Sequence, residues 1–222
     1  MNKKHNYNIE WNFEKELVDF QDSFEFMQKR VEDIIAGEKP QFIWSLEHPP
    51  VYTAGVSAND ADLLTKTDIP VYKTNRGGKY TYHCPGMRII YVMLDLKQFF
   101  APEKPDVSRF VKFLENWVIG ILAEFGIKGE LKKDRIGIWV TDENGVEKKV
   151  AALGIKLRKW VSYHGIAINI DPDMSGFNNI VPCGISEFGV TSIAEILGHI
   201  DEKKFDDVVQ NTFETMRLKR EF

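Results

Sequence analysis

The sequence predicts an α+β fold, a mixed β-sheet flanked by α-helices. Two observations predict it: long amphipathic segments alternate with short apolar runs of strand length, and glycine turns separate those runs. No repeat or low-complexity tract divides the 222 residues. We therefore expect residues 1–222 to form a single domain, with a small C-terminal lobe from about residue 185 as the alternative.

Three long stretches carry apolar residues at spacings of three and four, which is typical of amphipathic helices. Asp106 can cap the second stretch, and Gly37 and Gly126 can close the first two. Ser192 and Glu195 have the spacing of a capping box, which predicts a further short helix. The long predicted helices cover residues 13–37, 106–126 and 203–220.

Shorter apolar runs, bounded by glycine, proline and asparagine, predict the strands of the sheet. Asn144-Gly145 is a strong hairpin signal, so Lys149 should lie on the second strand of that hairpin and point away from the face that Lys148 takes. Gly165 stands inside another predicted strand, where it permits the close approach of a backbone or a ligand. The predicted strands cover residues 42–46, 71–73, 79–83, 88–95, 136–140, 146–157 and 160–170.

Composition narrows the classes of function. The formal charge of −4 argues against a general binder of nucleic acid or of membrane surfaces, because such proteins carry a basic excess. The two cysteines are far apart, which suits a reducing compartment better than a disulfide framework. No apolar run approaches the ~20 residues of a membrane span, and the first residues are polar. We therefore expect a cytoplasmic protein.

Cys183 is the candidate nucleophile. Pro182 and Gly184 flank it, so the thiol is predicted to lie on a tight loop and not in a periodic core segment. A free thiol with a pKa near ~8.5 is only about 3% ionised at pH 7, so a nucleophilic cysteine needs a neighbouring cation or base. Lys149 can supply either, and the residues alone do not separate these roles. The alternatives are a packed small hydrophobe at Cys183 and a solvated surface charge at Lys149.

Five separated motifs together resemble the lipoyl(octanoyl) transferases of lipoate biosynthesis, that is, the octanoyl-[acyl-carrier-protein]:protein N-octanoyltransferase family. They occur in the family's order and cover most of the chain, which makes the set far more specific than any single motif. The motifs are residues 48–55 (HPPVYTAG), 76–86 (RGGKYTYHCPG), 149–154 (KVAALG), 164–169 (HGIAIN) and 180–185 (IVPCGI) followed by 189–192 (GVTS).

The resemblance implies the fold of the biotin and lipoate protein ligase catalytic domains. It implies transfer of an octanoyl group from octanoyl-acyl carrier protein to a lysine of a lipoyl domain, with no cofactor and no metal. The acceptors would be lipoyl domains of 2-oxoacid dehydrogenase complexes or the H protein of glycine cleavage, and we expect a monomer without nucleic-acid or membrane partners. Cys183 falls on the family's acyl-thioester nucleophile and Lys149 on its partner. The residues that fall on the acyl-substrate pocket are Arg76, Gly77, Gly78, Lys79, Tyr80, Thr81, Tyr82, His83, Ala152, Leu153, Gly154, Gly165, Ile166 and Ala167.

Two positions depart from the family's pattern. Cys84 and Met87 stand where the family usually has a glycine and a glutamine, so the local wall of the pocket is expected to differ in shape. Cys84 also competes for the role of nucleophile because His83 adjoins it. Adjacent residues on a strand point to opposite faces, however, so we expect Cys84 to be a packed thiol.

Three other functions remain open at this point. An ATP-dependent lipoate or biotin protein ligase would use a lysine on the same strand but would not need the cysteine. A thioester hydrolase would resolve the acyl-enzyme with water and not with an amine. A binding protein without catalysis would form no covalent adduct. Basic residues also gather between residues 128 and 159, and we expect them to steer an acidic partner or to protect a sheet edge.

Overall fold

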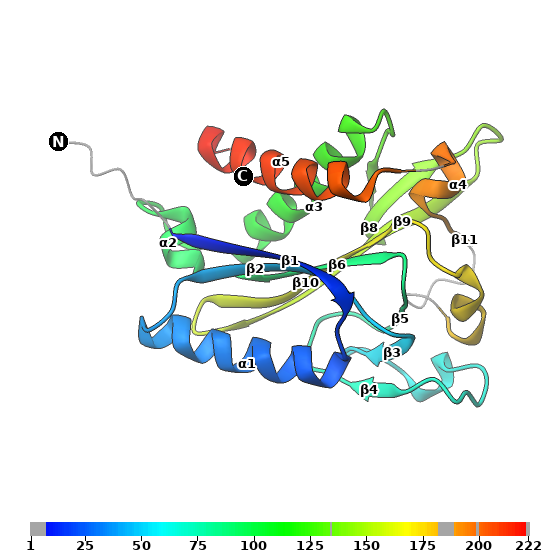
Figure 1. Cartoon of the computed structure of the whole chain (residues 1–222), viewed down its shortest axis with the longest axis horizontal. Coiled ribbons are helices and arrows are strands. Elements are labelled where there is room, and N and C mark those ends of the chain that lie inside the picture. The colour runs from blue at the N-terminus through cyan, green and yellow to red at the C-terminus, as the bar shows by residue number, and fades with distance from the viewer. Residues whose placement is uncertain (1–7, 134, 182–188, 199, 221–222) are drawn as a thin grey trace.

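The computed structural model describes residues 8–133, 135–181, 189–198 and 200–220 (Figure 1). Its large sheet has the order β1-β2-β6-β10-β9-β8-β7, and β11 also pairs with β9. The strands of this sheet are β1 (Ile9–Leu17), β2 (Gln41–Glu47), β6 (Met87–Met93), β7 (Glu130–Lys132), β8 (Arg135–Thr141), β9 (Glu147–Arg158), β10 (Val161–Asn169) and β11 (Gly189–Val190). A smaller sheet has the order β4-β3-β5, formed by β3 (Val51–Ala54), β4 (Val71–Lys73) and β5 (Tyr80–His83).

Helices cover both faces of the large sheet. Helix α1 (Phe20–Ala36) lies on one face beside the small sheet, and α3 (Val107–Glu124) and α5 (Glu202–Lys219) lie on the other (Figure 1). The two short helices are α2 (Leu96–Phe100) and α4 (Ile193–Leu197). Strand β1 runs parallel to β2 and β11 parallel to β9, whereas the other neighbours in this sheet are antiparallel. The α+β class and the mixed sheet are therefore confirmed.

The predicted start of the first helix was wrong. Residues 9–17 form β1, and α1 begins only at Phe20, where the carboxylate of Asp19 accepts hydrogen bonds from the first backbone amides. The apolar spacing that suggested a helix also fits a strand, on which Trp11 and Phe13 share one face and their rings stack. Trp11 packs edge-on against Phe213 of α5, so contacts with a distant helix decide the local structure.

The later elements follow the predicted order. Asp106 caps α3, and Gly37 closes α1 in a left-handed conformation with φ of 75°. The β8–β9 hairpin turns through Gly145, also at positive φ, while the Asp142 carboxylate accepts from two backbone amides of the turn. Strands β1, β3, β7 and β11 and helix α2 were not predicted. Of these, β7 and β11 have only three and two residues, too few for a recognisable period.

The C-terminal helix packs into the core of the large sheet. Phe205, Val209 and Phe213 of α5 are fully buried and belong to the same apolar cluster as the inner face of α3. The indole Nε1 of Trp117 on α3 donates to the Val209 carbonyl at 3.0 Å. Among the described residues, no helix has the length and apolar character needed to cross a membrane.

Candidate active site

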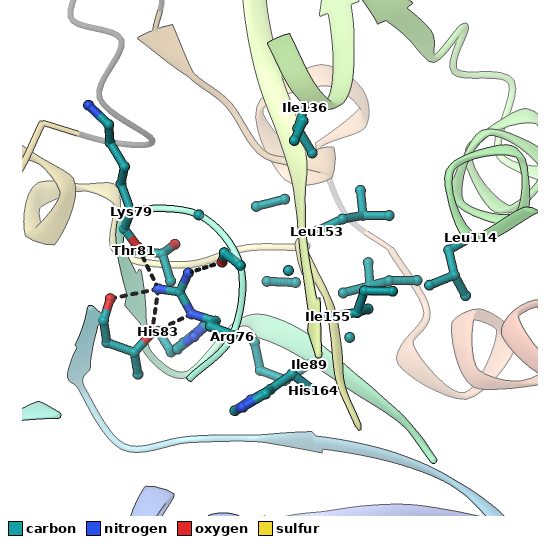
Figure 2. Close-up of a pocket in the computed structure, with 18 of the residues that line it drawn as sticks. Arg76, Lys79, Thr81, His83, Ile89, Leu114, Ile136, Leu153, Ile155 and His164 are labelled. Carbon is teal, nitrogen blue, oxygen red and sulfur yellow. Dashed lines mark hydrogen bonds between the residues drawn. The ribbon is translucent and has the colours of Figure 1, made fainter. Parts of the chain in front are cut away.

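A cavity of about 370 Å³ lies between the small sheet and strands β9 and β10 (Figure 2). Every residue that the sequence predicted to bind an acyl substrate lines it, except Tyr82, and Lys149 lines it as well. Tyr82 instead packs against the rings of Tyr52 and Phe177. The cavity therefore brings together predicted acyl-pocket residues that are up to about ninety positions apart in the chain, counted from 76 to 167. That these residues bind the substrate stays a prediction.

Apolar side chains from two helices and from strand β8 complete the cavity, and sequence reasoning missed them as cavity residues. Phe20 comes from α1, Val111 and Leu114 come from α3, and Ile136 from β8 stands at one end in Figure 2. Apolar spacing marked Phe20 and Leu114 only as core, which is what most such positions are. No local signal separates a core side chain from one that borders a cavity.

Arg76 shapes one wall of the cavity. Its guanidinium donates to the Thr53 hydroxyl at 3.2 and 2.9 Å, to the Thr53 carbonyl at 2.7 Å, and to the Gly77 and Lys79 carbonyls at 2.9 and 2.8 Å (Figure 2). These bonds fold the 76–79 loop onto β3. Arg76 therefore holds the glycine loop against the small sheet.

The glycines of the motifs serve close approaches between backbones. An ideal Cβ on Gly165 would lie 2.0 Å from the Ile90 carbonyl oxygen of β6, a distance that no side chain tolerates. An ideal Cβ on Gly154 would lie 3.0 Å from the Gly77 carbonyl oxygen, and the Gly77 amide donates to the Ile155 carbonyl at 3.2 Å. The glycine loop, residues 76–79, thus lies directly on β9 and forms one wall of the cavity.

Lys149 lies inside the structure, unlike its neighbour. It is 6% exposed, and its Nζ has no hydrogen-bond partner among the described residues. Lys148 points to the other face, where its Nζ lies 3.6 Å from an Asp142 carboxylate oxygen. The predicted opposite orientation of the two lysines is confirmed. A buried polar atom without a partner is rare in folded proteins and suits an atom kept for a ligand.

Two buried histidines, His83 and His164, line the cavity, and a third, His48, packs against the His83 ring; all three are neutral at pH 7. Burial lowers the pKa of His48 to about 4 and that of His164 to about 3, and it holds the pKa of His83 well below its usual value. His48 Nδ1 donates to the Val18 carbonyl at 2.6 Å, so its Nε2 accepts from the Tyr91 hydroxyl at 2.7 Å. His83 and His164 line the cavity, where they add polarity without positive charge.

The two cysteines differ in what the structure describes. Cys183 lies outside the described residues. Cys84 is 2% exposed, belongs to the core cluster under α1, and does not line the cavity. Burial raises the pKa of its thiol, which opposes a role as nucleophile. The prediction of a packed thiol at Cys84 is confirmed, and Met87, which is 1% exposed, does not line the cavity either.

On the C-terminal side of Cys183, the described chain begins with β11, which pairs with β9 at Lys149. Val190 of β11 pairs with Lys149, and the Thr191 amide donates to the Lys149 carbonyl at 2.9 Å. The buried Asn169 side chain at the end of β10 donates to the Thr191 carbonyl at 2.8 Å. On the N-terminal side of Cys183, the Val181 amide donates to the Asp62 carbonyl at 2.8 Å.

Comparison with known proteins identifies the family of the chain. The family model of the lipoyl protein ligase A/B catalytic domain matches residues 19–214. An octanoyltransferase of Maricaulis maris is 52% identical over 202 residues, which are 90% of this chain and 87% of that protein. An octanoyltransferase of Ehrlichia chaffeensis is 49% identical over 205 residues, 92% and 94% of the two chains.

Solved structures show the same fold at low sequence identity. A bipartite lipoate protein ligase of Thermoplasma acidophilum superposes with a TM-score of 0.67 at 14% identity, covering 91% of this chain and 82% of that one. A biotin protein ligase of Aquifex aeolicus gives 0.55 at 18% identity, covering 96% and 71%. The fold implied by the five motifs is therefore confirmed. The chain belongs to the lipoyl protein ligase A/B catalytic-domain family and, within it, to the octanoyltransferases, which are acyltransferases.

Proposed function

We propose that the chain transfers an octanoyl group from octanoyl-acyl carrier protein to a lysine of a lipoyl domain, through a thioester on Cys183. One observation carries this proposal: the apolar cavity beside β9 is bordered by a buried Lys149 whose Nζ has no hydrogen-bond partner among the described residues. The pairing of Val190 with Lys149 supports a role for Lys149 close to the segment that carries Cys183. The acceptors would be lipoyl domains of 2-oxoacid dehydrogenase complexes or the H protein of glycine cleavage.

In the first step, the Cys183 sulfur attacks the carbonyl carbon of the donor thioester. Lys149 takes the thiol proton and, as a cation, stabilises the thiolate. Backbone amides stabilise the tetrahedral oxyanion. The bond from carbon to the donor sulfur then breaks, Lys149 returns the proton to that sulfur, and the octanoyl group remains on Cys183.

In the second step, the amine of the acceptor lysine attacks the octanoyl carbonyl carbon. An amide bond forms, the bond to Cys183 breaks, and Lys149 passes the amine proton to the Cys183 sulfur. One thioester replaces another in the first step, and amide formation in the second is downhill. The sequence of steps therefore consumes no ATP, unlike the ligase reaction that the sequence left open.

Intact-mass analysis tests this proposal against its rivals. Mixing the protein with octanoyl-acyl carrier protein, without ATP, is expected to add the mass of one octanoyl group at Cys183 within one turnover. Addition of a lipoyl domain should discharge the adduct to the acceptor, whereas buffer alone should leave it in place. An adduct that water discharges as fast would identify a hydrolase. Acylation of the acceptor that requires ATP and free octanoate would identify a ligase.

Surface charge bears on the partners. Some of the basic residues between 128 and 159 form ion pairs with Glu130 and Glu147. Lys132 lies 2.8 and 2.6 Å from these two carboxylates, and Arg135 lies 2.6 Å from Glu147. Lysines beside Glu130 lower the pKa of its carboxyl to about 2. Exposed Lys133, at the end of β7, is a better candidate for steering an acidic carrier than these paired residues.

We expect Lys133→Glu to raise the KM for octanoyl-acyl carrier protein about three- to tenfold at low salt, because reversed charge slows an electrostatically steered encounter. The effect should shrink above ~0.3 M salt, where the Debye length falls to several ångströms. Lys97→Glu, an exposed lysine on α2 at the opposite end of the molecule, is the matched control (Figure 1). Equal effects of the two substitutions, or none at any salt, would contradict steering by this edge.

A further inference from the structure

Trp139 faces the ammonium of Lys149 across the β8–β9 pair. The two residues are partners in the register of these strands, just after an irregularity between Ile138 and Trp139. The Lys149 Nζ lies 4.9 Å from the centre of the indole ring, within the range of a cation–π interaction. Both side chains are buried, Trp139 at 1% and Lys149 at 6% exposure. Trp139 does not line the cavity itself, so it contacts the site through Lys149.

Among the described residues, the Trp139 indole stabilises this ammonium through a cation–π interaction. The Nζ has no hydrogen-bond partner among the described residues, and a buried cation without a compensating group is costly. Tryptophan is the best of the aromatic side chains at attracting a cation, and the attraction grows when water is excluded. The contact therefore limits where the end of the Lys149 side chain can lie.

The indole is held in turn by its own strand. Its Nε1 donates to the Arg135 carbonyl at 3.2 Å, four residues earlier on β8. The Arg135 guanidinium carbon lies 4.7 Å from the centre of the same ring, and that guanidinium pairs with Glu147 at 2.6 Å. A backbone hydrogen bond and a paired arginine thus fix the ring independently of Lys149.

Gly137 fixes the path of the Lys149 stem. An ideal Cβ on Gly137 would lie 3.1 and 3.2 Å from the Lys149 Cε and Cδ, and 2.7 Å from the Ala151 carbonyl oxygen. Its φ of 119° is one that residues with side chains rarely adopt. The glycine therefore leaves a channel for the methylene groups of Lys149, and the Trp139 ring, two residues further along β8, faces the charged end.

We propose that Trp139 is a positioning residue for the octanoyl-transfer reaction: its ring face holds the Lys149 ammonium at one place beside the acyl cavity. This inference rests on the proposed role of Lys149. Trp139 touches neither the substrate nor the sulfur, and it acts only through the lysine that it holds. Loss of the ring leaves the Lys149 side chain present but no longer fixed, so the thiolate loses the nearby charge.

The test is the rate at which iodoacetamide alkylates Cys183, measured against pH by peptide mass. At pH 7 we expect Trp139→Leu to slow alkylation about five- to tenfold and to shift the profile toward that of a free thiol. Trp139→Phe keeps a ring with a weaker attraction for cations, so its alkylation rate should lie between those of the wild type and of Trp139→Leu. Trp117→Phe removes the same atoms from the core beneath α3 and should leave the profile unchanged, even where the melting temperature falls.

A double variant shows whether Trp139 acts through Lys149. Trp139→Leu combined with Lys149→Ala should alkylate no more slowly than Lys149→Ala alone, because the second change removes the group that the first one positions. Additive slowing, or a wild-type profile in both Trp139 variants, would overturn the inference. Failure of the proposed function is distinguishable, because Lys149→Ala would then itself leave alkylation and octanoyl transfer unchanged.

Discussion

Replacement of Cys183 by serine is expected to abolish octanoyl transfer and leave the fold intact. A serine hydroxyl at neutral pH is a far weaker nucleophile than a thiolate, so we expect a fall of at least about a thousandfold in kcat with no trapped adduct. The measurement is transfer of octanoyl from octanoyl-acyl carrier protein to a lipoyl domain, with intact-mass analysis of the enzyme. Circular dichroism and a melting curve show whether the variant remains folded.

Cys84→Ser is the matched control, because it makes the same exchange of atoms at the other cysteine. Cys84 is buried with its Sγ 3.9 Å from the Asp173 carbonyl oxygen, and it does not line the cavity. Burial raises the pKa of this thiol, so it stays protonated and alkylates slowly at pH 7. The variant should keep most of its activity at some cost in stability. The reverse outcome, loss of transfer with Cys84→Ser alone, would move the nucleophile to Cys84.

Lys149→Ala should produce the second largest effect. Without the neighbouring cation, the reactivity of Cys183 is expected to approach that of a free thiol with a pKa near ~8.5. Alkylation at pH 7 would then fall by up to about 25-fold if the native pKa is near ~6.5. Octanoyl transfer should fall further, because the proton transfers of both steps are lost as well. Alkylation rates between pH 5 and 10 and trapped octanoyl adducts measure the two effects separately.

Lys149→Arg separates charge from proton transfer. Arginine stays protonated, so it can hold a thiolate but cannot take a proton from the acceptor amine. The variant should therefore recover part of the alkylation rate, form the acyl-enzyme, and discharge it slowly to the lipoyl domain. If the alanine variant alkylated and transferred octanoyl like the wild type, Lys149 would be a structural residue and the cysteine–lysine mechanism would be wrong.

Local chemistry in the sequence was enough for most of the fold. Asp106 caps α3 because a carboxylate before an apolar helical period satisfies free amides, and Asn144-Gly145 turns the β8–β9 hairpin because glycine tolerates positive φ. The five motifs indicated the family, and all but one of the residues placed in the acyl pocket line one cavity. The cap and the turn depend on neighbours in the chain, so they can be read from the chain, whereas the pocket residues were placed by the resemblance of the motifs to the family.

Contacts between distant segments decided the rest. Phe13 was expected on a helix but lies on a strand, where its ring stacks on Trp11. Trp11 in turn packs edge-on against Phe213, about two hundred residues later. Gly165 had to be a glycine, but only the structure shows that the Ile90 carbonyl is what approaches it.

The sequence by itself determined the class of fold, the family and the two residues proposed for the chemistry. Only the tertiary structure placed Lys149 in a buried cavity with Trp139 at its charged end. It also showed which cluster Cys84, predicted from the sequence to be a packed thiol, belongs to: the core under α1. The physical reason is the same in each case: burial and partnership depend on which strands and helices meet, and pairing across a sheet joins residues that no local pattern connects.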